Sequence, residues 1–172
     1  GTGKTHLSIA IAYEALRQGV EARYVRLPEV ATAVFAAKER TTIVEILKDI
    51  TKTPVVVIDD VGTDQLNRPT ARLLYQIVSE RRRNRVPTIL NTDRTPAAWS
   101  TQVGDRELIR RIVDTVLGGG HLISLGGVLP PSRTQIMAAV GRQGVDAASS
   151  GRSRHSLEIV LDILGNDARQ RD

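Results

Sequence analysis

The first five residues, GTGKT, constrain the fold more than any other feature, because they match the end of the phosphate-binding loop pattern GxxxxGK(S/T). Glycines in this pattern let backbone N–H groups turn toward phosphate oxygens, and the helix that follows adds the positive end of its dipole. Lys4 is expected to reach the β- and γ-phosphates of a nucleotide, and the Thr5 hydroxyl to bind Mg²⁺. A chance match ahead of an ordinary helix is the alternative.

Composition excludes several classes of protein. The chain has 172 residues, of which 41% are hydrophobic and 25% charged, as in a typical globular domain. It has no cysteine, which rules out disulfides and thiolate zinc sites, and its three histidines lack metal-ligand spacing. No apolar run is long enough to cross a membrane. The net charge of +5 permits nucleic-acid binding, whereas 3% aromatic content argues against a base-stacking platform.

An apolar run that ends in two acids predicts the second half of a nucleotide site. Val55–Ile58 is continuous, as in a strand buried on both faces, and Asp59-Asp60 completes the Walker B pattern. A buried parallel strand ends at the edge of the sheet where ligands bind. Asp59 is therefore expected to contact Mg²⁺ directly or through water, and Asp60 to position or activate the attacking water. The alternative is a strand that simply ends in two turn-forming acids.

Strands and helices alternate along most of the chain. The expected strands are 20–27, 55–58, 86–92 and 121–125. The expected helices run from the loop to Gly19, from Pro28 to about residue 50 with a break near Thr41-Thr42, from near Pro69, and from Asp105 to Gly118. This order predicts an α/β fold with a doubly wound, mainly parallel sheet.

Two polar features follow the Walker B strand. Asn91 and Asp93 share a face at the end of the next strand, where P-loop ATPases place a side chain that senses the γ-phosphate; a polar strand-to-loop junction is the alternative. A basic run after the preceding helix is either a solvated face or a surface that binds DNA or a partner. It consists of Arg81, Arg82, Arg83 and Arg85.

The alternation of strands and helices weakens after Gly126, and we place a domain boundary there. Residues 1–126 form the expected core, and residues 127–172 form a divergent tail. The tail contains a Gly/Ser/Arg-rich linker from Gly141 to Arg154, followed by a predicted short amphipathic helix from Ser156 to Leu164.

Four segments together resemble a known family. GTGKTHL, VVVIDDVG, TILNTDRTPAAW and RRIVD…HLISL, in this order and spacing, resemble the IstB-like ATPases, transposition helpers related to the DnaC/DnaI helicase loaders of the AAA+ superfamily. The resemblance covers roughly residues 1–126. It implies a P-loop NTPase with an AAA+ core that binds ATP and Mg²⁺ and forms a homo-oligomeric ring or helix. It further implies a cytoplasmic protein that acts on DNA beside a transposase or replicative helicase, away from any membrane.

The resemblance also implies roles by position. It places Thr5 and Asp59 at the metal, and Asp60 and Lys4 among the catalytic residues. Asn91 and Asp93 are the two candidates for the catalytic sensor of the γ-phosphate. The residues implied to bind the nucleotide are Gly1, Thr2, Gly3, Lys4, Thr5 and His6.

Two positions depart from the family pattern. The sensor asparagine falls on Asp93, whose carboxylate would repel a phosphate where an amide would donate a hydrogen bond. The Asp-Arg-Leu motif of the family reads Asp114-Thr115-Val116, and Thr115 cannot supply the charge of an arginine finger. Arg110 or Arg111, about one helical turn earlier, would have to take that role.

The expected sheet lacks one strand. In AAA+ proteins the strand that leads into the P-loop lies between the sensor strand and the last strand of the sheet. Without it, those two strands would face a gap lined by unpaired backbone groups.

The sequence is compatible with three functions. The chain is an ATP-hydrolysing switch that controls DNA or partner binding, if the full P-loop is present. It is alternatively a non-catalytic remnant, a DNA- or partner-binding module from a decayed mobile element. A small-molecule kinase is the third reading, which the strand order and the lack of an evident lid disfavour.

Overall fold

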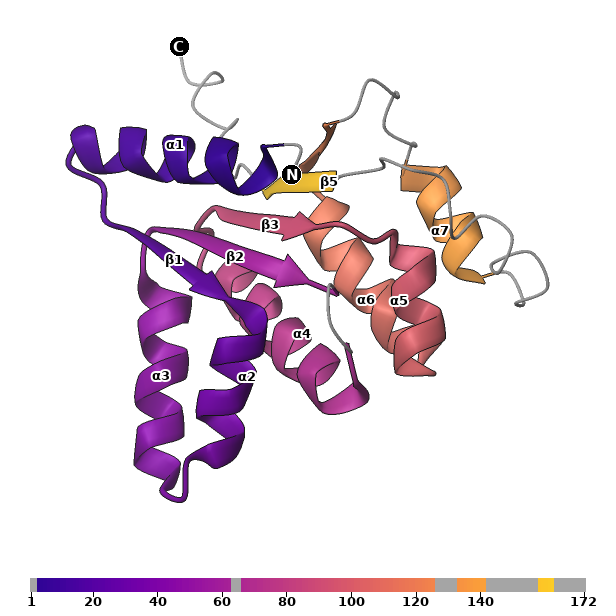
Figure 1. Ribbon diagram of the computed structural model, residues 1–172, viewed down its shortest axis with the longest axis horizontal. Coiled ribbons are helices and arrows are strands. Elements are labelled where there is room, and N and C mark those ends of the chain that lie inside the picture. The colour runs from indigo at the N-terminus through magenta and orange to yellow at the C-terminus, as the bar shows by residue number, and fades with distance from the viewer. Residues whose placement is uncertain (1–2, 63–65, 126–132, 142–157, 163–172) are drawn as a thin grey trace, which may run out of the picture.

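A five-stranded sheet forms the centre of the described part of the chain, which comprises residues 3–62, 66–125, 133–141 and 158–162. The computed structural model orders the strands β1-β2-β3-β5-β4 (Figure 1). Their bounds are β1 Ala22–Arg26, β2 Val55–Val61, β3 Thr88–Thr92, β4 His121–Ser124 and β5 Glu158–Asp162. β1, β2 and β3 pair in parallel, which confirms the predicted α/β fold with a mainly parallel sheet.

Helices cover both faces of this sheet. α1 (Lys4–Arg17) lies along one face, and α2 (Leu27–Ala36), α3 (Arg40–Lys52), α4 (Arg68–Arg83) and α6 (Arg106–Leu117) lie on the other (Figure 1). α5 (Pro96–Val103) and α7 (Arg133–Gly141) pack against each other and against α6. Within the described residues, no helix is both long enough and apolar enough to cross a membrane.

Strand β2 is buried on both faces, as its continuous apolar run predicts. Val57 packs with Ala12 of α1 and Ile89 of β3 in a small cluster on one face. Ile58 belongs to the larger core on the opposite face, among side chains of α2, α4 and α6. The strand continues through both acids to Val61, three residues beyond the predicted apolar run.

Most predicted helices are present, with two differences. The break between the second and third helices lies at residues 37–39 instead of Thr41-Thr42, because Ala37 and Glu39 both take an extended backbone conformation. α5 is absent from the sequence prediction, although Thr95 caps it by accepting a hydrogen bond from the N–H of Ala98 and Pro96 opens its first turn.

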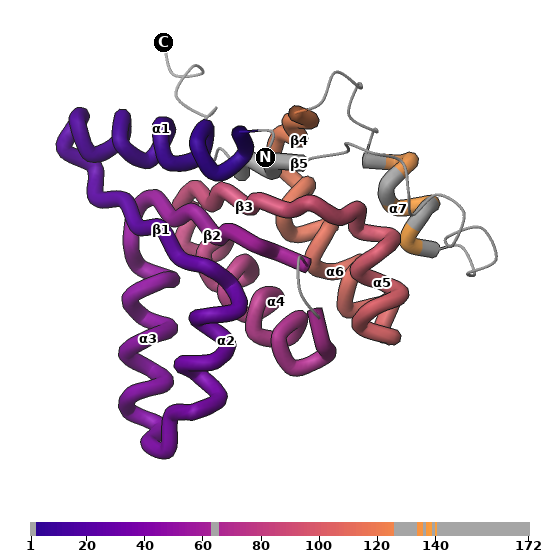
Figure 2. Tube along the Cα trace, viewed as in Figure 1, coloured from indigo at the N-terminus to yellow at the C-terminus, as the bar shows by residue number. Residues whose placement is uncertain are grey.

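Strand β5 corrects two expectations. It pairs antiparallel with both β3 and β4, so it occupies the position that the sequence predicts to be a gap (Figure 1). The Cα trace of Figure 2 shows β1, β2 and β3 side by side in the parallel part of the sheet. The predicted helix over 156–164 is wrong for its described residues, 158–162, which form this strand. The facing edges of β3 and β4 offer backbone donors and acceptors that a strand satisfies and a helix does not. The run Ile159-Val160-Leu161 also has the composition of a central strand, while the Gly/Ser/Arg-rich linker lies almost wholly outside the described residues.

The arginine run does not form one surface. Arg83 and Arg85 are exposed, but Arg81 is 0% exposed inside the protein. Its guanidinium donates to the carbonyl oxygens of Ile50 at 2.6 Å and Thr53 at 2.8 Å, at the end of α3. Arg81 therefore belongs neither to a solvated face nor to a binding surface. Its buried side chain connects α4 to the end of α3 through hydrogen bonds.

Candidate functional site

The end of the phosphate-binding loop has the backbone that its glycine predicts. Gly3 has φ of +91°, in the left-handed region that favours glycine, and it directly precedes α1. Among the described residues no side chain caps this helix end, so its first backbone N–H groups are available to an anion. Lys4 is the first helical residue, and its ammonium forms no ion pair with any described residue. Gly1 and Thr2 lie outside the described residues.

The two predicted metal-binding residues meet at the carboxyl ends of the strands. The Thr5 hydroxyl donates to Asp59 Oδ2 at 2.7 Å, and Asp59 is buried near the end of β2. The hydroxyl of Tyr24, on β1, donates to the same oxygen at 2.8 Å. Asp59 Oδ1 accepts a hydrogen bond from the backbone N–H of Asp60 at 2.8 Å. The carboxylate is therefore held on both oxygens.

These hydrogen bonds keep Asp59 charged. Burial by itself would raise the pKa of Asp59, but hydrogen bonds from Thr5, Tyr24 and the N–H of Asp60 outweigh it and lower the pKa below its ordinary value. The pKa of Tyr24 changes in the opposite direction. Burial is the largest cause and the neighbouring carboxylate of Asp59 the next, and together they raise the pKa of Tyr24 to about 12. Tyr24 thus stays a neutral donor beside an ionised acid.

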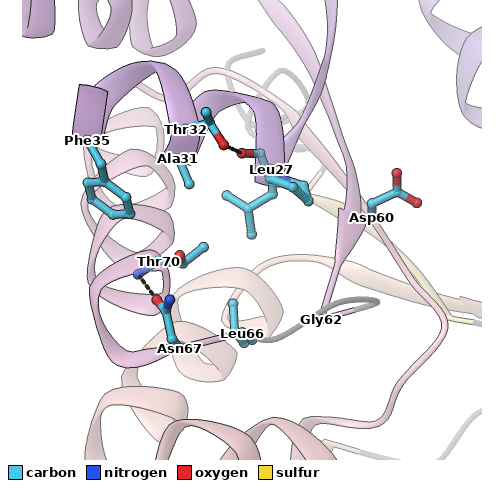
Figure 3. A pocket seen from close by; sticks show the side chains of 10 residues that line it. Leu27, Ala31, Thr32, Phe35, Asp60, Gly62, Leu66, Asn67 and Thr70 are labelled. Atoms are coloured by element: carbon cyan, nitrogen blue, oxygen red, sulfur yellow. Dashed lines mark hydrogen bonds between the residues drawn. The ribbon is translucent and has the colours of Figure 1, made fainter. Parts of the chain in front are cut away.

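Asp60 lies next to this centre but has a different partner. Its φ of +58° is unusual for a residue with a side chain, and its Oδ2 accepts a hydrogen bond from Arg26 Nε at 2.6 Å. Arg26 also pairs with Glu29 at 3.0 Å. The carboxylate points away from the neighbouring cavity (Figure 3). The role of Asp60 in activating water stays a prediction, and Arg26 is a partner that the sequence pattern did not reveal.

The structure separates the two candidate sensors. Asn91 is 0% exposed on β3 and accepts a hydrogen bond from Ser8 of α1 at 2.6 Å. It lies close enough to Asp59 to help lower the pKa of that carboxyl, yet its Nδ2 has no hydrogen-bond partner among the described residues. Asp93 lies beyond the end of β3, is exposed, and forms no hydrogen bond or ion pair with the described residues. The geometry therefore favours Asn91 as the sensor.

The remaining predicted residues stand apart from Asp59. His6 is exposed on α1 and makes no hydrogen bond to the residues that the structure describes. Thr115 donates from its hydroxyl to the carbonyl of Arg111 at 2.7 Å, within its own helix. Arg111 pairs with Glu107 at 3.1 Å, and Arg110 is exposed without an ion pair to any described residue. The identity of an arginine finger stays a prediction.

The residues present fit a hydrated magnesium ion. Thr5 and Asp59 supply the hard oxygen ligands that Mg²⁺ prefers. In the described part of the chain no three His, Cys, Asp or Glu residues cluster to hold a metal by themselves. A cation here would keep several waters and share the phosphates of a nucleotide, which is the usual way in which proteins bind Mg²⁺.

A separate cavity of about 470 Å³ lies between α2, the end of β2 and the start of α4 (Figure 3). Apolar side chains such as Leu27, Phe35 and Leu66 line it, and Thr5 and Tyr24 do not. Among the described residues that line it, Asp60 is the only charged one, and its side chain turns away from the cavity. The cluster around Asp59, and not this cavity, is therefore the candidate nucleotide site.

Gly62 fixes how the chain leaves β2, and its replacement by alanine is expected to destabilise the protein by about 2–4 kcal/mol. Its φ is +80°, and a Cβ at this position would lie 2.3 Å from Nε1 of the buried Trp99. Gly19→Ala is the matched control, because Gly19 has φ of +78° and a Cβ there would meet nothing within 4 Å. Urea unfolding should show a larger loss for Gly62→Ala; equal losses would contradict a role for the Trp99 contact.

Three features together are typical of a P-loop NTPase. They are a glycine in the left-handed conformation before a helix, a helix end without a side-chain cap among the described residues, and a hydroxyl hydrogen-bonded to a buried acid near the end of a strand. The chain belongs to the family of IstB-like ATP-binding proteins, whose sequence model matches residues 1–135. This confirms the resemblance to IstB-like and DnaC-like AAA+ ATPases inferred from the motifs.

Individual relatives agree with this family. A protein named for ATP binding in insertion sequence IS5376 of Geobacillus stearothermophilus is 28% identical over 127 residues, 74% of this chain and 50% of its own length. Its counterpart in IS21 of Pseudomonas aeruginosa is 27% identical over 127 residues, 74% of this chain and 48% of the relative. The replicative helicase loader DnaC of Escherichia coli is 26% identical over 112 residues, 64% of this chain and 46% of the loader. The chain thus spans about half the length of these relatives.

Proposed function

We propose that this chain is an ATP-driven switch. It would be a cytoplasmic helper that binds and hydrolyses ATP with Mg²⁺ and thereby changes its affinity for DNA. One observation carries the proposal. The Thr5 hydroxyl donates to Asp59 Oδ2 at 2.7 Å, which joins the phosphate-binding loop to the Walker B acid across 54 residues of sequence. Because the proton of Thr5 points at Asp59, the lone pairs of its oxygen stay free for a cation.

Each side chain has a role in this proposal. Lys4 would neutralise the β- and γ-phosphates, and Thr5 and Asp59 would hold Mg²⁺, which when bound offsets charge on the phosphate oxygens. Nδ2 of Asn91 has no hydrogen-bond partner among the described residues, and it is a donor suited to a γ-phosphate oxygen. Asp60 would orient water only after it exchanges its contact with Arg26 for one with the site.

The partners follow from the relatives. Their names place them in insertion sequences or as a loader of the replicative helicase. We therefore propose DNA together with a transposase or replicative helicase as partners, and a homo-oligomer as the working form. Arg110 is an exposed arginine without an ion pair to the described residues, so it is available to a nucleotide on a neighbouring copy.

DNA binding measured in three nucleotide states tests the switch. Fluorescence anisotropy of a labelled duplex should report at least about fivefold different affinities with Mg-ATP and with Mg-ADP, which is the lower end of typical coupling between two sites. The affinity without nucleotide should resemble that with ADP. The Lys4→Ala variant is the control, since it should bind DNA equally in all three states.

A second candidate is a DNA- or partner-binding module without catalysis. Two observations favour it, namely the exposed carboxylate of Asp93 at the family's sensor position and the absence of an arginine at Thr115. DNA binding that is retained but identical in all nucleotide states, with no ATP turnover, would support this candidate and contradict the switch.

A further inference from the structure

Tyr24 contacts the Walker B acid from outside both sequence motifs. It lies on β1, whose register with β2 pairs Tyr24 with Val57 and Arg26 with Asp59. Partners in parallel strands share a face of the sheet, so Tyr24 and Asp59 lie on one face, two residues apart along the strand direction. That offset is about 6.6 Å, and a phenol ring spans it where a serine or threonine hydroxyl would not. The result is the 2.8 Å hydrogen bond from Tyr24 to Asp59 Oδ2.

The hydrogen bonds of Asp59 determine which of its oxygens is left for a metal. An ionised carboxylate has about four acceptor positions, two on each oxygen. Thr5 and Tyr24 take both positions on Oδ2, and the N–H of Asp60 takes one on Oδ1. These three donors leave one position, which lies on Oδ1, and the amide of Asn91 is near the same carboxylate.

We propose that Tyr24 is a positioning residue for magnesium, which holds Oδ2 of Asp59 so that Oδ1 is presented to the ion or to one of its waters. This inference rests on the proposed function, because the metal arrives with the nucleotide. Loss of the phenol hydroxyl leaves Oδ2 with Thr5 alone, and the carboxylate gains freedom to rotate. Partners in this outer position typically change metal affinity by about 10- to 100-fold when removed.

The hydroxyl can be separated from the ring. Tyr24 is 40% exposed, so Tyr24→Phe keeps the partly buried ring and removes the one hydrogen bond. Tyr13→Phe is the matched control, because Tyr13 is 64% exposed on α1 and makes no hydrogen bond to described residues. Asp59→Asn and the double variant Tyr24→Phe/Asp59→Asn complete a cycle that tests whether Tyr24 acts through Asp59.

Calorimetric titration of the full chain with ATP, in EDTA and over a series of MgCl₂ concentrations, tests the proposal. Tyr24→Phe should raise the Mg²⁺ concentration needed for half-maximal tightening of ATP binding by about tenfold. ATP affinity in EDTA should stay within about twofold, and Tyr13→Phe should match the wild type in both measurements. In the Asp59→Asn background, the Tyr24 change should have no further effect.

Three outcomes would overturn the inference. An unchanged Mg²⁺ midpoint in Tyr24→Phe would refute it while leaving the proposed function intact. Equal weakening of ATP binding with Mg²⁺ and in EDTA would show a general defect in folding or shape instead of metal positioning. A wild-type chain whose ATP binding does not respond to Mg²⁺ would refute the proposed function itself, and this inference with it.

Discussion

Replacing Lys4 with alanine is expected to weaken ATP binding by at least about a hundredfold, since a charged hydrogen bond to phosphate contributes about 1.5–3 kcal/mol and the site loses its cation as well. Lys4 is the first residue of α1, beside the left-handed Gly3, and its ammonium has no partner among the described residues that would hold it elsewhere. Turnover should fall to background, because the same ammonium offsets charge on the transferred phosphoryl group.

Lys48→Ala is the control for this change. Lys48 is exposed on α3, on the face of the sheet opposite α1, so it shares the charge of Lys4 but not its position. Binding is measured by calorimetry with Mg-ATP, and turnover by phosphate release. Unchanged turnover in Lys4→Ala would contradict the proposal that this loop holds the nucleotide.

Local motifs explain why much of the site was predictable. Gly3, Lys4 and Thr5 are neighbours in sequence, and the apolar run before Asp59 requires a buried strand. The two segments meet because parallel strands end at one edge of the sheet. The hydrogen bond from Thr5 to Asp59 follows from that rule and two short stretches of sequence.

The contacts that the sequence did not predict depend on register and on where strands end. Tyr24 reaches Asp59 only because β1 pairs with β2 in one particular register. Asn91 and Asp93 differ because β3 ends at Thr92, after which the chain turns and the shared strand face no longer exists. β5 was missed for a related reason, since its pairing depends on strands far from it in sequence.

Replacing Arg81 with methionine is expected to lower the free energy of unfolding by about 3–4 kcal/mol. The guanidinium donates to Ile50 O and Thr53 O at the end of α3, to Pro87 O at 2.5 Å, and to Thr88 Oγ1 at 2.8 Å. Methionine fills a similar volume but donates nothing, so several buried oxygens lose their donor, at about 1–3 kcal/mol each. Removal of a buried cation returns part of that loss, because the desolvation cost of the charge disappears.

Two further variants separate the hydrogen bonds from the charge. Arg81→Lys keeps the cation, but a single ammonium cannot reach both α3 and the segment before β3, so an intermediate loss of stability is expected. Arg83→Met is the control, because Arg83 is exposed at the end of the same helix and pairs only with Glu80 among the described residues. Urea unfolding measures all three. An Arg81→Met variant within about 1 kcal/mol of the wild type would show that the desolvation cost of the buried guanidinium cancels its hydrogen bonds.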